Sequence, residues 1–144
     1  MIVILNDTVS TEIKEYLLTQ DGITNVQLKQ DDYKNIIDIK YNEKITPEII
    51  MKFIELFQEN KYSVLIGFDK KQDIKCNKII YHIDDLCCEY CYMGLIEDLF
   101  ENKYIKSVYS NYDYFKLPIN LELQIEYYDN YSEEKVIDFI KERI

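Results

Sequence analysis

The 144-residue sequence has no tryptophan, one histidine, three glycines and two prolines. So little glycine and proline leaves no room for a flexible linker or a low-complexity segment. No apolar run approaches the roughly 20 residues that a membrane-spanning helix requires. The start of the chain, "MIVILNDTVSTEI", has neither the basic segment nor the apolar length of a signal peptide. We therefore expect a soluble, cytoplasmic protein that does not insert into a membrane through this segment, with one medium domain or two small ones.

Basic residues are also scarce. Lysine and arginine number 17 against 27 aspartates and glutamates, so the formal net charge is −10. Affinity for nucleic acid comes largely from basic side chains that neutralise phosphates, and no cluster of such residues occurs in the sequence. The 14 tyrosines could stack on bases, but tyrosine is also typical of sheet faces. The charge therefore argues against a nucleic-acid partner.

The sequence has only four cysteines, and most of them are clustered. Three of the four cysteines lie in "CCEYC", residues 87–91, directly ahead of an amphipathic segment. In a reducing compartment such a cluster is more typical of a metal site or of redox chemistry than of a structural disulfide. A loop that enters a helix places thiols beside unpaired backbone N–H groups and the positive end of the helix dipole, which favour the thiolate. Two thiolates with two residues between them can converge on one soft ion such as Cu(I) or Zn(II).

The chain also contains an internal repeat. Residues 37–54 align without a gap with residues 123–140, and the segments before them align after a short adjustment in the turn at 110–118. Each copy has a short apolar strand, an amphipathic helix, two strands with alternating apolar residues and a second amphipathic helix. The first copy adds a fourth strand at 62–68, whereas the second ends at Ile144 without one.

Capping residues predict where several helices begin and end. Ser10 is the expected N-cap of the first helix, and Gly22 follows the end of that helix. Thr46 precedes Pro47 at the start of the second helix, where proline at the first helical position removes no hydrogen bond. Ser132 is the expected N-cap of the last helix.

The element order β-α-β-β-α-β is that of the ferredoxin-like fold, whose two helices cover one face of a four-stranded antiparallel sheet. We therefore predict an α+β protein with two tandem ferredoxin-like units, the second lacking its last strand. The predicted domains are 1–70 and 71–144. A short polar connector within 69–77 would join them.

The second unit resembles the heavy-metal-associated domain, the module of copper chaperones and of the N-terminal tails of metal-exporting P-type ATPases. That family places Gly-Met-x-Cys-x-x-Cys between its first strand and its first helix, where this chain has "DLCCEYC", 85–91. Leu86 stands in the place of the methionine, and Cys88 and Cys91 stand in the places of the paired cysteines. Downstream, "YIKSV", 104–108, is similar to the family's Gly-Val-x-Ser-Val.

The resemblance implies a protein that binds and transfers a metal ion and is not an enzyme. It would be a chaperone, or the cytosolic N-terminal regulatory region of a metal-transporting P-type ATPase. Cys88 and Cys91 would hold the ion, and the partner, an ATPase or a metallochaperone, would take it over by thiolate ligand exchange. The first unit has "NDTV", 6–9, in the equivalent place, so it would keep the fold without cysteine ligands.

Cys87 is an addition to the family pattern and bears on the choice of metal. Cu(I) accepts two sulfur ligands, whereas Zn(II) prefers four ligands in a tetrahedron. Four ligands would be approached if Cys87 bound the ion together with Cys88 and Cys91. The fourth would be an oxygen from Asp85, Glu89 or water. We expect Zn(II) or Cd(II), with Cu(I) as the alternative, and Cys87 as a mere spacer is the other interpretation.

The sequence also contains two other possible ligands and allows two alternative functions. His82 lies on a strand before the cluster and Cys76 lies in the connector, and we expect neither to bind the metal. A thioredoxin-like thiol–disulfide oxidoreductase also carries Cys-x-x-Cys between a strand and a helix. A protein-interaction module without a metal role is the second alternative.

Overall fold

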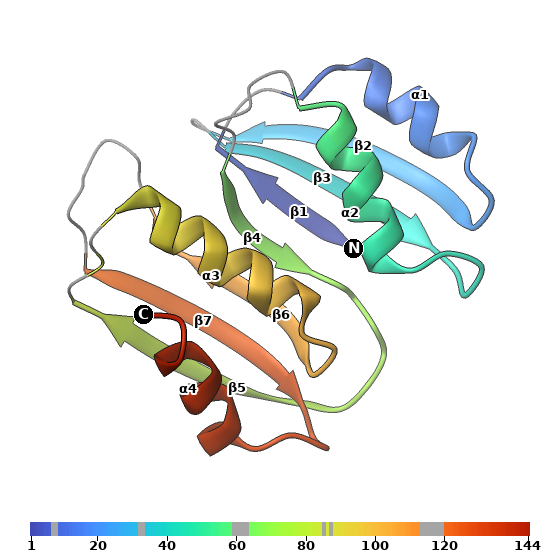
Figure 1. Cartoon of the computed structure of the whole chain (residues 1–144). Coiled ribbons are helices and arrows are strands. Elements are labelled where there is room, and N and C mark those ends of the chain that lie inside the picture. The colour runs from blue at the N-terminus through green and yellow to red at the C-terminus, as the bar shows by residue number, and fades with distance from the viewer. Residues whose placement is uncertain (7–8, 32–33, 59–63, 85, 87, 113–119) are drawn as a thin grey trace. The chain divides into compact units, whose positions relative to one another are not determined.

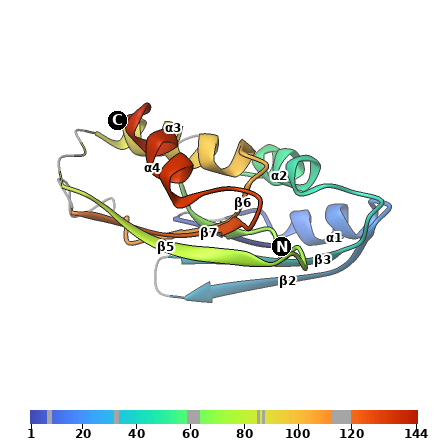
Figure 2. The ribbon, with the colours of Figure 1, turned by 90° about the horizontal axis from the view of Figure 1, so that it is seen from below.

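The computed structural model describes residues 1–6, 9–31, 34–58, 64–84, 86, 88–112 and 120–144. Over these residues the chain forms seven strands and four helices and divides into two compact units, Met1–Leu65 and Ile66–Ile144. In each unit the helices cover one face of an antiparallel sheet (Figure 1, Figure 2). None of the helices in the described ranges has the length and apolar character needed to cross a membrane.

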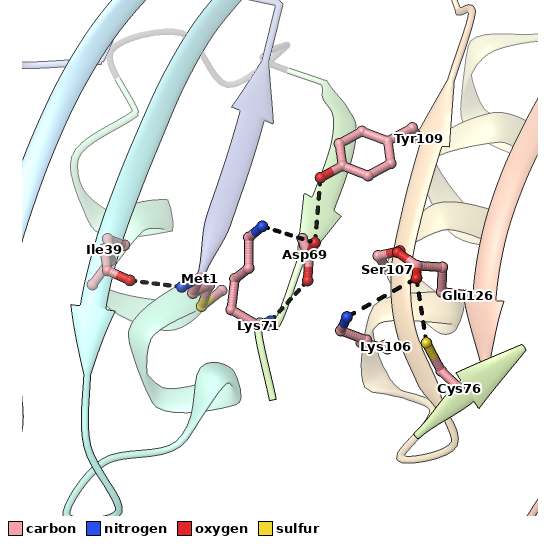
Figure 3. Close-up of polar contacts among 9 residues, drawn as sticks. All are labelled: Met1, Ile39, Asp69, Lys71, Cys76, Lys106, Ser107, Tyr109 and Glu126. Atoms are coloured by element: carbon pink, nitrogen blue, oxygen red, sulfur yellow. Dashed lines mark hydrogen bonds and ion pairs between the residues drawn. The ribbon is translucent and has the colours of Figure 1, made fainter. Parts of the chain in front are cut away.

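The first unit is built on a three-stranded sheet. Its elements are β1 (Ile2–Leu5), α1 (Glu12–Leu18), β2 (Ile23–Asp31), β3 (Lys34–Tyr41) and α2 (Pro47–Leu56). The strands are hydrogen-bonded in the order β2-β3-β1, with Val26 opposite Ile39 and Val3 opposite Ile37. The ammonium group of Met1 donates to the carbonyl oxygen of Ile39 at 2.6 Å, which ties the start of the chain to β3 (Figure 3). The core consists of alternate strand residues and one face of each helix, chiefly Val3, Leu5, Ile13, Leu17, Val26, Ile37, Ile39, Ile50 and Ile54.

The second unit has a four-stranded sheet. Its elements are β4 (Leu65–Asp69), which begins at the last residue of the first unit, β5 (Cys76–Ile83), α3 (Glu89–Glu101), β6 (Ile105–Ser110), β7 (Leu121–Tyr128) and α4 (Glu133–Lys141). The strands are hydrogen-bonded in the order β4-β6-β7-β5. Alternation on β7 buries Leu121, Leu123 and Ile125 beneath the helices. The apolar face of α3 meets this sheet, and the ring of Phe100 contacts that of Phe68 edge-on at 5.0 Å.

Three of the four predicted helix signals are confirmed. The Thr46 hydroxyl accepts the N–H of Ile49 and Pro47 begins α2, while the Ser132 hydroxyl accepts the N–H of Lys135 and caps α4. Gly22 has φ +100°, and a Cβ there would lie 2.9 Å from Ile45, so the turn after α1 requires glycine. Ser10 lies one residue before the N-cap position, Thr11, but its hydroxyl accepts the N–H of Glu12 at 3.4 Å, whereas that of Thr11 accepts none in the first turn.

The predicted fold class is wrong, because β4 pairs with a strand of the second unit. The sequence pattern assigned residues 62–68 to the first unit as a fourth strand. A strand does form there, β4, and it is antiparallel to β6 of the second unit, with Gly67 opposite Tyr109 and Phe68 opposite Val108. The first unit therefore has three strands and the second has four, and the protein is not two tandem ferredoxin-like units but seven antiparallel strands with four helices.

The physical reason is that an apolar pattern specifies a strand but not its neighbour. Residues Ile66 to Asp69 are all buried, so either face of β4 could have packed on a core. The aromatic contact of Phe68 with Phe100 is available only beside β6 and α3. The chain divides into its two compact units between Leu65 and Ile66. The domain limits 1–70 and 71–144 stay predictions.

Candidate metal centre

The cysteine cluster lies where a strand of the second unit leads into a helix. β5 ends at Ile83 and α3 begins at Glu89. Cys88 is the N-cap of α3, with extended backbone angles of φ −163° and ψ 168°, and its carbonyl oxygen accepts the N–H of Tyr92. Cys91 lies in the first helical turn. Both cysteines therefore lie at the N-terminus of α3. At this end the backbone N–H groups lack helical partners and the helix dipole is positive.

The two thiols are adjacent. The Sγ atoms of Cys88 and Cys91 are 3.4 Å apart, with Cys88 as donor, far beyond a covalent S–S bond of about 2.05 Å. Both residues are half-buried. With a Zn–S bond of about 2.3 Å, tetrahedral coordination separates two sulfurs by about 3.8 Å. The observed distance is shorter by a few tenths of an ångström, an adjustment within the range of small side-chain rotations.

Buried side chains on both sides anchor the cysteine segment. Leu86 precedes the pair and is buried, and Tyr92 follows it and is fully buried. The Tyr92 hydroxyl lies 2.7 Å from Ser110 Oγ, and its ring stacks on Tyr112 with the centroids 4.1 Å apart. Burial raises the pKa of Tyr92 far above its ordinary value, so the phenol stays protonated. The thiols are thus held at the surface between two points attached to the core.

The structure brings together only part of the predicted ligand set. Cys87 and Asp85 lie outside the described residues. Glu89 is half-buried, and its Oε1 atom is buried without a hydrogen-bond partner in the described part of the chain. Within that part, no group of three or more histidine, cysteine, aspartate or glutamate side chains is arranged to hold a metal ion. The described geometry therefore brings two sulfur atoms together.

His82 and Cys76 both lie on β5. His82 is exposed and is paired in register with Glu122 of β7. Cys76 donates its thiol hydrogen to Glu126 Oε2 at 3.3 Å. The thiol of Cys76 therefore has a hydrogen-bond partner on β7.

The sequence did not predict a polar cluster that lies on one face of the sheet in the second unit. Glu126 accepts hydrogen bonds from Ser107 at 2.8 Å and from Cys76 at 3.3 Å, and Lys106 lies 4.0 Å away (Figure 3). Burial raises the pKa of Glu126, but these two hydrogen bonds and nearby lysines outweigh burial and hold it below its ordinary value. Burial and the charge of Glu126 raise the pKa of Cys76. The only signal in the sequence was the polar alternation of β7, which is equally typical of a solvated face.

The same face carries a second carboxylate, and this one is buried. Asp69 is 4% exposed and accepts the backbone N–H of Lys71 at 2.8 Å and the Tyr109 hydroxyl at 3.5 Å (Figure 3). Lys71 has φ +54°, a left-handed conformation that the hydrogen bond to Asp69 supports. Burial, together with the charge of Asp69, raises the pKa of Tyr109 to about 12. Because the groups of this cluster satisfy one another, the arrangement stabilises the sheet and does not call for a ligand.

No protein-family model and no curated protein matches this chain. The resemblance to the heavy-metal-associated domain therefore rests on the sequence motifs at 85–91 and 104–108, and the functional argument rests on the two sulfurs at the start of α3.

Proposed function

We propose that Cys88 and Cys91 bind one soft metal ion, Zn(II), Cd(II) or Cu(I), and release it to a partner by exchange of thiolate ligands. The observation that carries this proposal is the 3.4 Å separation of the two Sγ atoms at the N-terminus of α3. Soft thiolates select these ions over hard cations such as Mg²⁺ and Ca²⁺. The partner would be a metal-transporting P-type ATPase or a metallochaperone, with the chain serving as a chaperone or as the regulatory segment of such a pump.

Binding requires both thiols to lose their protons. The first turn of α3 favours this change, because its backbone N–H groups and its dipole stabilise negative charge at the N-terminus. Both cysteines are half-buried and not sealed in the core, which supports access by an incoming thiolate. A site with few protein ligands exchanges its ion through a shared intermediate in which donor and acceptor sulfurs bind together, so the ion is never released to water.

Titration of the reduced protein with Cd(II), Zn(II) and Cu(I) tests the proposal, with thiolate-to-metal charge-transfer absorbance as the signal. We expect one equivalent to bind, and replacement of Cys88 and Cys91 together by serine to abolish binding while the circular dichroism spectrum is retained. Cys76→Ser is the matched control, since that thiol contacts Glu126, and it should bind normally. Tight binding of one equivalent by the double variant would refute the site.

The identity of the remaining ligands is a separate question. Cys87→Ser should weaken Zn(II) and Cd(II) binding if Cys87 is a third ligand, and should leave it unchanged if Cys87 is a spacer. Counting sulfur neighbours by X-ray absorption in the wild type and in this variant gives an independent answer. Three sulfurs favour Zn(II) or Cd(II), whereas two favour Cu(I).

The short separation of the thiols also favours a second candidate function, thiol–disulfide exchange. In that reaction Cys88 and Cys91 would lose two protons and two electrons to a substrate disulfide and become bonded to each other. An insulin-reduction assay and a redox titration against glutathione distinguish the two functions. A metal-transfer protein should bind the ion tightly and show no reductase turnover.

A further inference from the structure

β5 lies at one edge of the sheet in the second unit, and its outer side has no neighbouring strand among the described residues (Figure 1). Four of its residues are exposed, namely Asn77, Lys78, Ile80 and His82, and Ile80 is exposed by 53%. An unpaired strand edge presents a row of N–H and C=O groups that can pair with another strand. The edge of β5 is therefore a surface to which a further strand can be added.

The pairing of β5 with β7 shows which backbone groups face outward. Successive residues of an antiparallel strand direct these groups to opposite sides. The N–H of Asp129, directly after β7, donates to the carbonyl oxygen of Lys75, and the register then continues without a shift along the whole of β5. The odd-numbered residues of β5 therefore bond to β7, whereas Lys78, Ile80 and His82 direct their N–H and C=O groups to the open side. Within the described part of the chain, none of these outward groups has a hydrogen-bond partner.

β5 also lacks most of the features that discourage pairing at a sheet edge, which are charges, prolines and bulges. β2, the outer strand of the first unit, has a register shift between Ile23 and Asn25, and its far end carries exposed Lys29 and Asp31. β5 has no proline, no register shift and a single lysine in its eight residues. Of these two edge strands, β5 is the one suited to pairing.

The composition of β5 favours a second copy of this chain as the added strand. β5 contains no aspartate or glutamate, although the net charge of the chain is −10, so two β5 strands meet without acidic side chains opposite one another. Copies related by a twofold axis present the same edge to each other. With the axis at Ile80, the two exposed Ile80 side chains lie opposite one another, and Lys78 of each copy lies opposite His82 of the other. An apolar pair on one face of adjacent strands stabilises their pairing.

We propose that two copies of this chain associate through antiparallel pairing of their β5 strands, so that the sheet of the second unit continues from one copy into the other. The backbone of Ile80 exchanges hydrogen bonds with Ile80 of the second copy, and Lys78 does so with His82. Because this pairing occupies the open edge of β5 in both copies, the association stops at a dimer. The inference goes beyond the proposed function and does not depend on metal binding.

The two cysteine pairs are served by opposite ends of the paired strands. β5 ends at Ile83, three residues after Ile80, and leads from there to Cys88. At about 3.3 Å per residue, the Ile83 residues of the two copies are about 20 Å apart. Each copy should therefore bind its own metal ion, and the dimer should form without metal.

Sedimentation equilibrium of the protein in reducing agent and EDTA tests the association, since disulfides and shared metal ions are then absent. We expect a reversible equilibrium between monomer and dimer. Amide hydrogen exchange followed by NMR should slow at Lys78, Ile80 and His82 as the protein concentration rises, whereas Ile79 and Tyr81, whose N–H groups face β7, should exchange slowly at every concentration. A monomer at every concentration would overturn the proposal, even if an extended peptide of another protein bound the edge. A dimer in which the three outward amides stay unprotected would also overturn it.

Substitutions at Ile80 test the position of the axis. Ile80→Lys and Ile80→Glu each place like charges opposite one another, so each variant alone should dimerise about tenfold more weakly than the wild type. An equimolar mixture of the two should recover the dimer, because a lysine then lies opposite a glutamate. Ile74→Lys is the matched control, since Ile74 is 55% exposed but precedes β5, and it should dimerise normally. Failure of the mixture to associate more tightly than either variant alone would overturn the proposal.

The variant with Cys88 and Cys91 both replaced by serine separates this interface from the metal site. It should dimerise as the wild type does. Loss of the dimer in this variant would show that the thiols join the two copies and would overturn pairing through β5. Failure of the protein to bind metal would refute the proposed function and leave this test unchanged.

Discussion

Replacement of Gly67 by alanine tests the pairing of β4 with β6. Gly67 lies opposite Tyr109 in the register. A Cβ at this position would lie 2.8 Å from the carbonyl oxygen of Val108 and 3.2 Å from Cδ1 of Tyr109. Because the nearer atom belongs to the backbone of β6, the strand itself has to move, and rotation of a side chain cannot relieve the contact.

The size of the effect follows from two opposing contributions. Overpacking of a well-packed site costs about 1–3 kcal/mol. The lower entropy of the unfolded alanine chain offsets about 0.4–1 kcal/mol of this cost. We expect the free energy of unfolding to fall by about 1–2 kcal/mol, which corresponds to a decrease in Tm of about 4–16 °C for a small domain.

Thermal unfolding followed by circular dichroism measures this change. Gly94→Ala is the matched control, since the same substitution at a site with open space should raise the free energy of unfolding by about 0.5–1 kcal/mol. The two variants should therefore shift Tm in opposite directions. If β6 did not lie opposite Gly67, alanine would not meet the backbone of β6. An unchanged or raised Tm for Gly67→Ala would contradict the corrected fold.

Three further predictions concern the buried polar groups of the second unit. Tyr92→Phe removes the hydroxyl that lies 2.7 Å from Ser110 Oγ and should lower the free energy of unfolding in urea by about 1 kcal/mol, whereas a change of less than a third of that would refute a stabilising role. The pKa of Glu126 is lowered in the folded state. Its contribution to the free energy of unfolding is therefore present above the unfolded pKa and is lost as the pH falls through the folded pKa. Ser107→Ala removes one hydrogen bond that lowers this pKa, so the free energy of unfolding should fall less steeply between about pH 5 and pH 3 in the variant. The pKa of Cys76 is raised by burial and by Glu126, so iodoacetamide at mildly alkaline pH should alkylate Cys76 more slowly in the folded protein than in urea, as measured by mass spectrometry, and Glu126→Gln should speed the reaction.

Local features of the chain could be predicted because their causes are local. The hydroxyls of Thr46 and Ser132 accept N–H groups three residues ahead, so the cap and its partner are specified within one turn. The period-2 alternation of Leu121, Leu123 and Ile125 specifies a strand with one buried face. The position of Cys88 at the start of α3 follows from the same reasoning, since an amphipathic helix must begin where its apolar stripe begins.

Contacts between distant segments could not be predicted in this way. The partner of β4, the hydrogen bond from Cys76 to Glu126 and the contact of Tyr109 with Asp69 each join residues that are far apart in the sequence. Each depends on which strands become neighbours. The polar residues involved also alternate with apolar ones as they would on a solvated face, so no pattern distinguished them.

The sequence by itself determined the elements, most helix caps, the scarcity of basic charge and the placement of two cysteines at a strand-to-helix junction, because propensity, periodicity and capping act over a few neighbouring residues. Only the tertiary structure decided that β4 pairs with β6 and that a polar cluster forms on one face of the sheet in the second unit. It also decided that the sulfurs of Cys88 and Cys91 lie 3.4 Å apart and that no atom of the described residues lies within 4 Å of a Cβ placed on Gly94. These outcomes depend on three-dimensional packing, since the burial of a strand is favourable beside any apolar edge and only the fit of particular side chains, such as Phe68 against Phe100, selects one edge over another.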